Sequence, residues 1–225
     1  MATSMSHPPA ESAPGRSRRA GRSPFQEEQR RQTRGRILDA AAQVFNARPY
    51  FSATIDDIVK AARISRVTFY LHFPSKLAVA ADLVALTKPR ACAHFAELAS
   101  LPRHDLARLG QWIVELRGLY LDSGYLSVLA VQIKLLEPEG QGVIDAMGED
   151  LLAVLAPDFP AFAGLDQPGA TAARRGVLAR NLLQRLDAFC TEAVLRPQRP
   201  LDPVGLAIMA EEMAALLWGG PAPVV

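Results

Sequence analysis

The stretch that decides the fold is Thr54–Leu77, which reads TIDDIVKAARISRVTFYLHFPSKL. Its first residues, threonine followed three positions later by Asp57, form a start signal for a helix. The buried face of that helix is predicted from apolar residues at helical spacing: Ile55, Ile58, Val59 and Ala62. Residues 63–64 leave room only for a tight connection, after which Ser65 offers an N-cap hydroxyl. The stretch therefore predicts two short helices separated by a turn.

The second short helix is predicted over Arg66–His72, because Phe73-Pro74 disfavours helical geometry beyond it. Ser75 then caps a further helix that starts at Lys76, runs to Thr87 and continues past a bend at Pro89. Two short helices with a tight turn, the second opening on polar side chains, match the helix-turn-helix pattern.

In that pattern one face of the second helix packs on its neighbours and the other enters the DNA major groove. Ile64, Phe69 and Phe73 suit the packed face. Groove or backbone contacts are predicted for the side chains left over, which are Arg66, Val67, Thr68, Tyr70 and His72.

Each of these contacts has a chemical basis. Arg66 can donate two hydrogen bonds to guanine, and Thr68 can meet a base or a thymine methyl group. The Tyr70 hydroxyl can reach a phosphate. Thr54 and Lys76, at the starts of helices, are predicted to meet phosphates as well. Any one of these residues alone is equally compatible with a helix cap or a solvated side chain, but their joint spacing favours DNA binding.

The rest of the chain predicts further helices separated by turn residues. A helix over Phe25–Ala47 precedes the motif, with an apolar stripe that includes Ile37, Ala41 and Phe45. Five more follow it: Asp105–Leu121, Tyr125–Leu136, Val143–Leu155, Ala170–Leu195 and Pro203–Trp218. We therefore expect an all-α protein of about nine helices, with a three-helix DNA-binding domain over residues 25–76 and a larger domain over 77–225.

Charge is distributed unevenly along the chain. The chain as a whole has a net charge of +2, yet residues 14–36 hold eight arginines against two glutamates. This basic end suggests a polyanion as its partner. Residues 1–24 predict a disordered basic arm. Such an arm can enter the minor groove, act as a non-specific tether or make no contact, and we hypothesise that it adds DNA affinity with little sequence choice.

Other classes of protein find little support. No run of 18 apolar residues predicts a membrane span, and two separated cysteines are typical of reduced thiols in a cytoplasmic protein. No phosphate-binding loop, CxxC pair or metal-binding histidine spacing is present, and the four histidines are scattered. We expect no catalytic residues, no metal and no cofactor, and a location in the cytoplasm at the nucleoid. Catalytic groups can still assemble from distant positions.

The motif region resembles the tetracycline-repressor (TetR) family. The resemblance covers about residues 30–85, and five pieces carry it: Ile-Leu-Asp-Ala-Ala from Ile37, Phe45, Thr54-x-x-x-Ile58, Ser65-x-x-Thr68-Phe69-Tyr70-x-His72-Phe73 and Ser75-Lys76. It implies a homodimeric all-α repressor, with a DNA-reading head and a body that binds a small effector. The chain departs from the family at Arg63, where the turn usually has glycine. If Arg63 keeps a positive φ, its side chain costs about 1 kcal/mol, and it either meets a phosphate or, as we favour, is solvated.

The resemblance also assigns roles to the C-terminal helices. The last two are expected to pair with their symmetry mates, through two apolar stripes: Leu178, Leu182, Leu186 and Phe189, and Val204, Ile208, Met209, Met213 and Leu216. An intramolecular core is the equal alternative. The effector pocket is predicted among the middle helices, lined by His94, Phe95, Trp112, Tyr120 and Tyr125. Few charges interrupt residues 112–136, which favours an uncharged, hydrophobic effector. A regulator that responds only to a protein partner is the competing hypothesis.

Overall fold

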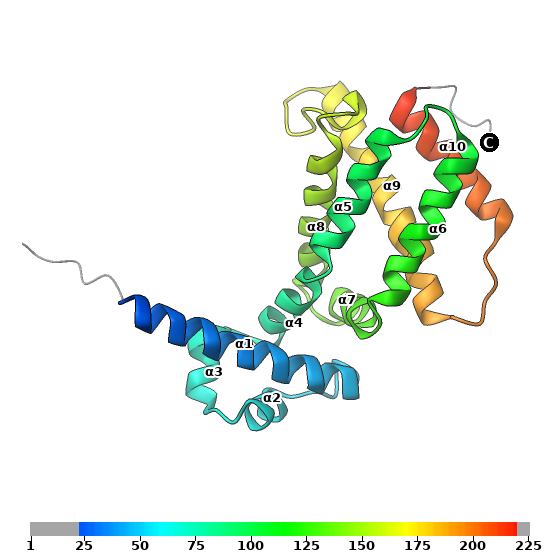
Figure 1. Ribbon diagram of the computed structural model, residues 1–225. Helices are drawn as coiled ribbons and strands as arrows, with labels where there is room; N and C mark the ends of the chain where they lie inside the picture. Colours follow the sequence, from blue (N-terminus) through cyan, green and yellow to red (C-terminus); the bar gives the residue numbers. More distant parts are fainter. Residues whose placement is uncertain (1–22, 220–225) are drawn as a thin grey trace, which may run out of the picture.

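The structure is a computed structural model that describes residues 23–219. Over this range the chain forms ten α-helices and two short 3-10 helices without any strand, which confirms the predicted all-α class (Figure 1). The α-helices are α1 (Pro24–Ala47), α2 (Ile55–Ala62), α3 (Arg66–His72), α4 (Lys76–Ala85), α5 (Lys88–Ala96), α6 (Leu106–Asp122), α7 (Tyr125–Leu136), α8 (Gly140–Leu155), α9 (Ala170–Leu195) and α10 (Pro203–Trp218). The 3-10 helices are η1 (Glu97–Ser100) and η2 (Pro160–Phe162).

The predicted basic arm lies outside the described residues, except for the two residues that begin α1. Ser23 is the N-cap of α1, and its hydroxyl accepts a hydrogen bond from the backbone N–H of Gln26 at 3.3 Å. The Gln26 side chain accepts one from the N–H of Ser23 in return, at 3.2 Å. Pro24 follows at the first helical position, where its missing N–H costs nothing. These residues belong structurally to the N-terminal domain.

Helices α1, α2 and α3 form an N-terminal domain at one end of the molecule, with α2 and α3 against the same side of α1 (Figure 1). The predicted N-caps are all present: Thr54, Ser65 and Ser75 each accept a hydrogen bond from the backbone N–H three residues ahead. Phe69 and Phe73 are buried in the domain core, and Ile64 packs against that core. Local capping signals and apolar spacing therefore account for this domain.

The helix predicted to continue from Lys76 past Pro89 is divided in two. A turn at Leu86–Thr87 separates α4 from α5. Pro89 lies in the first turn of α5, where proline is tolerated, so it does not bend a continuous helix. This break is why the described residues contain ten α-helices when about nine were expected.

The larger domain has a core of its own between α6, α9 and α10. Trp112 and Ile113 from α6 are buried against Leu186 from α9 and Met213 from α10. Helix α8 packs on α5 and α7, and it closes the side of the domain opposite α10 (Figure 1).

The two domains share apolar packing through α7. Leu129 and Ile133 of α7 are buried in the same cluster as Ile58 of α2 and Phe69 of α3. Helix α7 also lies beside α4 at the junction of the domains (Figure 1). Helix α7 therefore contributes directly to the core of the N-terminal domain.

Among residues 23–219 no single helix is both long and apolar enough to cross a membrane. Cys190 is buried and Cys92 half-buried, and both are free thiols.

Candidate DNA-binding surface and ligand pocket

Helix α3 exposes one continuous stripe of side chains. Arg66, Val67, Tyr70 and Leu71 occupy positions i, i+1, i+4 and i+5, which share one face of a helix. Val67 is 72% exposed and Leu71 69% exposed, whereas Phe69 on the opposite face is fully buried. Leu71 was missed by the sequence prediction, although its position four residues after Val67 was an available signal. We call these four residues the α3 stripe.

Thr68 and His72 lie at the margin of the α3 stripe and are half-buried. The Thr68 hydroxyl lies 2.9 Å from that of Ser65 and is hydrogen-bonded to it. The Nδ1 atom of His72 is buried, and within residues 23–219 it has no hydrogen-bond partner. Burial lowers the pKa of His72, and the nearby positive charges of Arg30 and Arg34 lower it further. The predicted contacts of both side chains therefore require some reorientation.

Arg66 is held by an acidic residue in this structure. Its guanidinium lies 3.3 Å from a carboxylate oxygen of Asp56 in α2, and both side chains are largely exposed. An exposed ion pair of this kind contributes at most about 1 kcal/mol. Asp56 can thus orient Arg66 without preventing it from exchanging the carboxylate for a DNA acceptor.

Thr54 is exposed at the start of α2, as a phosphate contact requires. Its hydroxyl already donates to Asp57 at 2.7 Å and accepts from the backbone N–H of the same residue at 3.1 Å. The hydrogen bonds from Thr54 hold the pKa of the Asp57 carboxyl below its ordinary value.

The ammonium of Lys76 is engaged within the protein, which differs from the phosphate contact expected for it. It donates to the carbonyl oxygens of Tyr50 at 2.9 Å and Ala53 at 3.1 Å, and lies 3.9 Å from the centre of the Tyr50 ring. Burial lowers the pKa of Lys76. Three donors on one flexible stem let Lys76 satisfy two carbonyls of the loop before α2. At the start of α4 the backbone N–H of Ala78 donates to Ser75, and the N–H groups of Lys76 and Leu77 remain for a phosphate.

Two arginines of α1 donate hydrogen bonds to the carboxyl ends of α2 and α3. Arg36 donates to the carbonyl of Ala62, the last residue of α2, at 2.8 Å. Arg34 donates to the carbonyl of His72, the last residue of α3, at 3.4 Å. The carboxyl end of a helix carries partial negative charge and unpaired carbonyls, so a cation stabilises it.

Arg34 has two further contacts that fix its position. It forms an ion pair with Asp82 of α4, and its guanidinium lies 4.1 Å from the centre of the Phe73 ring. Two arginines of the basic segment 14–36, Arg34 and Arg36, therefore stabilise the packing of α2 and α3 on α1.

The turn between α2 and α3 contains the one departure from the family pattern. Arg63 has φ 53° and ψ 49°, the left-handed conformation for which glycine is favoured. Its backbone N–H donates to the carbonyl of Lys60, and the N–H of Ile64 donates to that of Val59. These are the two hydrogen bonds of a Schellman motif. The side chain of Arg63 is exposed and makes no hydrogen bond or ion pair within the described range.

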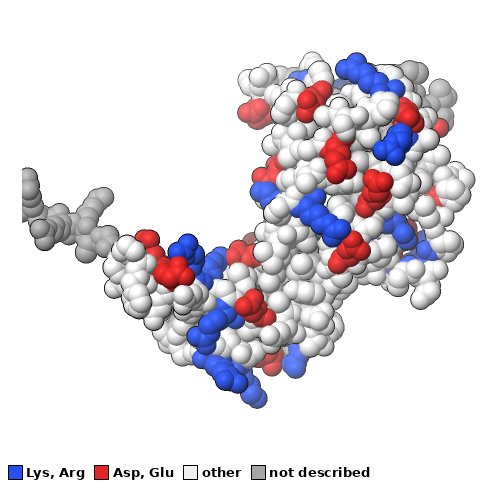
Figure 2. Space-filling model, in the orientation of Figure 1, with Lys and Arg blue, Asp and Glu red and all other residues white. Residues whose placement is uncertain are grey.

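Surface charge differs between the two domains. In Figure 2, Lys and Arg side chains gather along the lower edge of the N-terminal domain. On the visible face of the larger domain, basic and acidic side chains are interspersed. The positive potential that attracts a polyanion is therefore concentrated at the end that holds the motif.

A cavity of about 350 Å³ lies inside the larger domain between α4 and α9. Most of its wall is apolar, with contributions from Phe95, Leu116, Leu126, Ala130, Ile144 and Leu183. Two polar clusters interrupt it. The Tyr120 hydroxyl donates to Asp187 at 3.0 Å, and the Lys134 ammonium lies 3.3 Å from the same carboxylate. An ion pair between Arg180 and Glu149 also lines the cavity. Burial and the nearby Asp187 raise the pKa of Tyr120 well above its ordinary range. A cavity of this size and lining is typical of a site for a small ligand.

Two of the five residues predicted for the pocket, Phe95 and Tyr120, line this cavity. His94 and Trp112 do not line it; they stack on each other as part of a buried pair, with ring centres 4.6 Å apart. Tyr125 is half-buried and packs on the core of the N-terminal domain. Aromatic residues in this region are mostly core, and spacing alone does not separate core residues from pocket residues.

A hydrogen-bonded latch joins α7 to the DNA-binding domain. Tyr50, in the loop between α1 and α2, donates its hydroxyl to Glu137 just beyond α7, and its backbone N–H donates to the Gln132 side chain at 2.6 Å. Tyr50 is fully buried, and burial followed by the hydrogen bond to Glu137 raises its pKa far above the ordinary value. Because Ala130 and Lys134 of the same helix line the cavity, α7 contacts both sites. No local sequence signal marks this latch.

The two apolar stripes of α9 and α10 each divide between core and surface. Leu182 and Leu186 of α9 and Met213 of α10 are buried inside the chain. Leu178 and Ile208 are exposed. One side of each stripe therefore belongs to the intramolecular core, and pairing of the exposed side with a second copy stays a prediction.

The chain matches known proteins most clearly in its motif region. Residues 37–83 match the family model described as "Bacterial regulatory proteins, tetR family". The regulator UidR of Escherichia coli is 40% identical over 65 residues, which are 29% of this chain and 33% of UidR. The chain thus spans about a third of the length of this curated relative.

Similarity of fold extends over most of the chain. Salmonella enterica GusR superposes with a TM-score of 0.54 at 23% identity, over 83% of this chain and 95% of GusR. Thermus thermophilus FadR, a TetR-family transcriptional repressor solved in complex with lauroyl-CoA, superposes with a TM-score of 0.54 at 23% identity, over 85% of this chain and all of FadR. Residues 37–83 therefore match the family of bacterial regulatory proteins named tetR, and most of the chain shares the fold of these two solved structures.

Proposed function

We propose that this protein regulates transcription by binding double-stranded DNA through α3 and by responding to a small apolar effector held in the larger domain. The observation that carries the proposal is the α3 stripe. Four exposed side chains, two of them large and apolar, project from a short helix whose opposite face is anchored by Phe69. Such a surface is costly to leave in water and suits the major groove.

The chemistry of the stripe assigns roles along α3. Arg66 donates to guanine O6 and N7 after exchanging Asp56 for the base, and Val67 and Leu71 meet thymine methyl groups. The Tyr70 hydroxyl donates to a phosphate. Thr54 and the N-terminus of α4 add phosphate contacts on either side of the groove, while the predicted contacts of Thr68 and His72 are secondary. We omit the Lys76 ammonium, because it is already bonded to loop carbonyls.

The protein acts as a homodimer in this proposal. Val177 and Leu178 of α9 and Val204 and Ile208 of α10 are exposed apolar residues on two long helices. Pairing this surface with a second copy removes it from water and places two copies of α3 on one DNA molecule. Two recognition helices then read half-sites about 34–36 Å apart, which is one turn of DNA. The operator is an inverted repeat.

The effector is a small, mostly apolar molecule. The cavity walls suit an alkyl or aromatic group, and the Tyr120–Asp187–Lys134 cluster suits one polar end. Thermus thermophilus FadR binds lauroyl-CoA on the same fold, which supports an acyl chain as a candidate. We propose that the effector releases the operator, so that the protein is a repressor acting in the cytoplasm at the nucleoid.

Helix α7 couples the two sites in this account. A ligand between α7 and α9 shifts Ala130 and Lys134, and the same helix carries the latch to Tyr50. The effector changes DNA affinity only if it binds the two arrangements of α7 with different affinity.

DNA binding is tested by selecting bound sequences from a random pool of duplex DNA with the full chain. We expect an inverted repeat whose half-sites are about one helical turn apart. A pool that stays random after selection would overturn the proposed function. A single half-site without a repeat would overturn the homodimer.

The effector is tested through the thermal midpoint of unfolding with lauroyl-CoA and with dodecanoate. A ligand that binds the native state raises the midpoint. Ala130→Phe fills the cavity and is expected to abolish this rise, whereas Ala96→Phe, on an exposed position of α5, leaves it intact. If neither compound moves the midpoint of the wild type, the apolar effector is wrong and the protein-partner alternative is favoured.

A further inference from the structure

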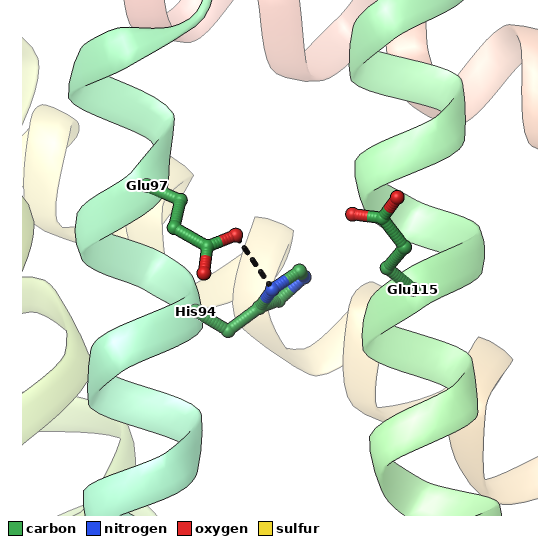
Figure 3. A group of neighbouring side chains, drawn as sticks. All are labelled: His94, Glu97 and Glu115. Carbon is green, nitrogen blue, oxygen red and sulfur yellow. Dashed lines mark ion pairs between the residues drawn. The ribbon is translucent and has the colours of Figure 1, made fainter.

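A cluster of three metal-ligating side chains lies between α5 and α6. It contains His94 of α5, Glu97 at the start of η1 and Glu115 of α6. One potential ligand atom from each lies within 4.8 Å of the other two. Figure 3 shows the Glu97 carboxylate directed toward the imidazole, and the Glu115 carboxylate on the facing helix α6. The proposed function uses none of these residues.

The imidazole of His94 is held in one orientation. His94 is only 7% exposed, and its ring stacks on Trp112 with an angle of 6° between the planes. Its Nε2 atom lies 3.0 Å from the backbone carbonyl of Trp112, and the indole N–H of Trp112 donates to the carbonyl of His94 at 3.0 Å. Because a carbonyl only accepts, Nε2 carries the proton.

The second ring nitrogen, Nδ1, therefore has a free lone pair and lies beside the Glu97 carboxylate. It lies 3.3 Å from an oxygen of Glu97. A nitrogen lone pair and a carboxylate oxygen repel each other at this distance unless a proton or a metal ion lies between them. A proton makes one positive charge, whereas Glu97 and Glu115 bring two negative charges. A divalent cation balances both.

We propose that His94 Nδ1, Glu97 and Glu115 bind a divalent transition-metal ion, with water in the remaining positions. Imidazole and carboxylates are ligands for Zn²⁺ and its neighbours in the transition series. The hydrogen bond from Nε2 to a backbone carbonyl is of the kind that commonly orients a metal-binding histidine.

The two glutamates have the freedom to complete the site. Ligand bonds of about 2.0–2.2 Å require the three atoms to draw closer than they are here. Glu97 is 60% exposed and Glu115 is exposed, so rotation of either side chain meets little resistance. One oxygen of Glu115 accepts a hydrogen bond from Gln111 at 3.1 Å, which leaves the other for the metal.

A metal ion at this position would link α5 to α6, and its ligands lie outside the cavity. Phe95 and Leu116, each the residue next to a ligand, line the cavity wall. The bound ion therefore stiffens the helix pair that supports the pocket.

The test is titration of the full chain with Zn²⁺ by calorimetry, together with its thermal midpoint. We expect one high-affinity ion per chain and a higher midpoint with Zn²⁺. Glu97→Gln and Glu115→Gln each remove one charged ligand at an exposed position, and each is expected to lower the affinity at least tenfold. Glu139→Gln, at an exposed glutamate beside α8, is the matched control and keeps the wild-type affinity.

Two outcomes would overturn the site. If both glutamine variants bind Zn²⁺ as tightly as the wild type, the ion lies on other histidines of the chain. If the wild type does not bind Zn²⁺, the metal site is wrong, and a lower midpoint for Glu97→Gln then identifies His94 and Glu97 as an ion pair with a proton. Neither result bears on DNA binding, so the inference and the proposed function fail separately.

Discussion

The turn between α2 and α3 allows a quantitative test, because Arg63 has a left-handed backbone in a position that suits glycine. For a residue with a Cβ atom this conformation costs roughly 1–2 kcal/mol. Glycine removes that cost but gains conformational freedom in the unfolded chain, which takes back roughly 0.4–1 kcal/mol. Arg63→Gly is therefore expected to raise the free energy of unfolding by about 0.5–1 kcal/mol.

Arg63→Ala is the control that separates the backbone from the side chain. Alanine keeps the Cβ atom and the strain but removes the guanidinium, which makes no polar contact in the described part of the chain. Its free energy of unfolding should therefore stay within about 0.5 kcal/mol of the wild type, as for most surface substitutions. In a chain of this size the glycine variant should melt about 2 °C above the alanine variant.

Urea unfolding followed by circular dichroism measures the stability difference. An Arg63→Gly variant less stable than Arg63→Ala would show that backbone strain at this turn is not the cause. The same two proteins test the role of the side chain in DNA binding. If Arg63 is solvated, both variants keep the wild-type salt dependence, whereas removal of a phosphate-binding side chain reduces the log–log slope by about 0.9.

Three further predictions concern the arm, the latch and the buried histidine. Deleting residues 1–22 leaves the Ser23 cap of α1 intact and should reduce the salt slope of DNA binding by about 0.9 for each phosphate that the arm neutralises in the full chain; an unchanged slope excludes the arm from binding. Tyr50→Phe removes the hydrogen bond to Glu137, which should cost about 1 kcal/mol of stability and weaken the effect of effector on DNA affinity; full coupling in this variant rules out the latch as the link. The pKa of His72 is lowered by burial and by nearby arginines. As the pH falls through 6.5, His72 therefore takes up a proton in the unfolded state before it does so in the folded state. The free energy of unfolding should therefore decrease below that pH. Urea unfolding of His72→Phe should show a flatter pH dependence, and an unchanged one contradicts this cause.

Much of the N-terminal domain could be predicted because its signals are local. Thr54, Ser65 and Ser75 cap helices through hydrogen bonds to groups three residues away, and the apolar spacing between them sets the buried face. Because these signals are local, the exposed positions of α3 could also be predicted from the sequence. Arg63 stood out through the resemblance to the TetR family, in which glycine usually occupies this turn, and the structure shows the left-handed backbone there.

Interactions between distant residues could not be predicted in this way. The ammonium of Lys76 meets Tyr50 and Ala53, more than twenty positions away in sequence. The stacked pair of His94 and Trp112 looked like pocket residues because aromatic spacing is the same for a core and for a cavity wall. Which side of an apolar helix faces a void depends on how all its neighbours pack.

The central claim is that the α3 stripe reads base pairs, and the most direct measurement is DNA selection repeated with Arg66→Ala beside Arg63→Ala. We predict that Arg66→Ala loses its base preference at one position in each half-site, at a cost of about 1–3 kcal/mol, and keeps the rest of the motif. Arg63→Ala should select the wild-type sequence. An Arg66→Ala protein that selects the unchanged motif with unchanged affinity would contradict base reading by the α3 stripe.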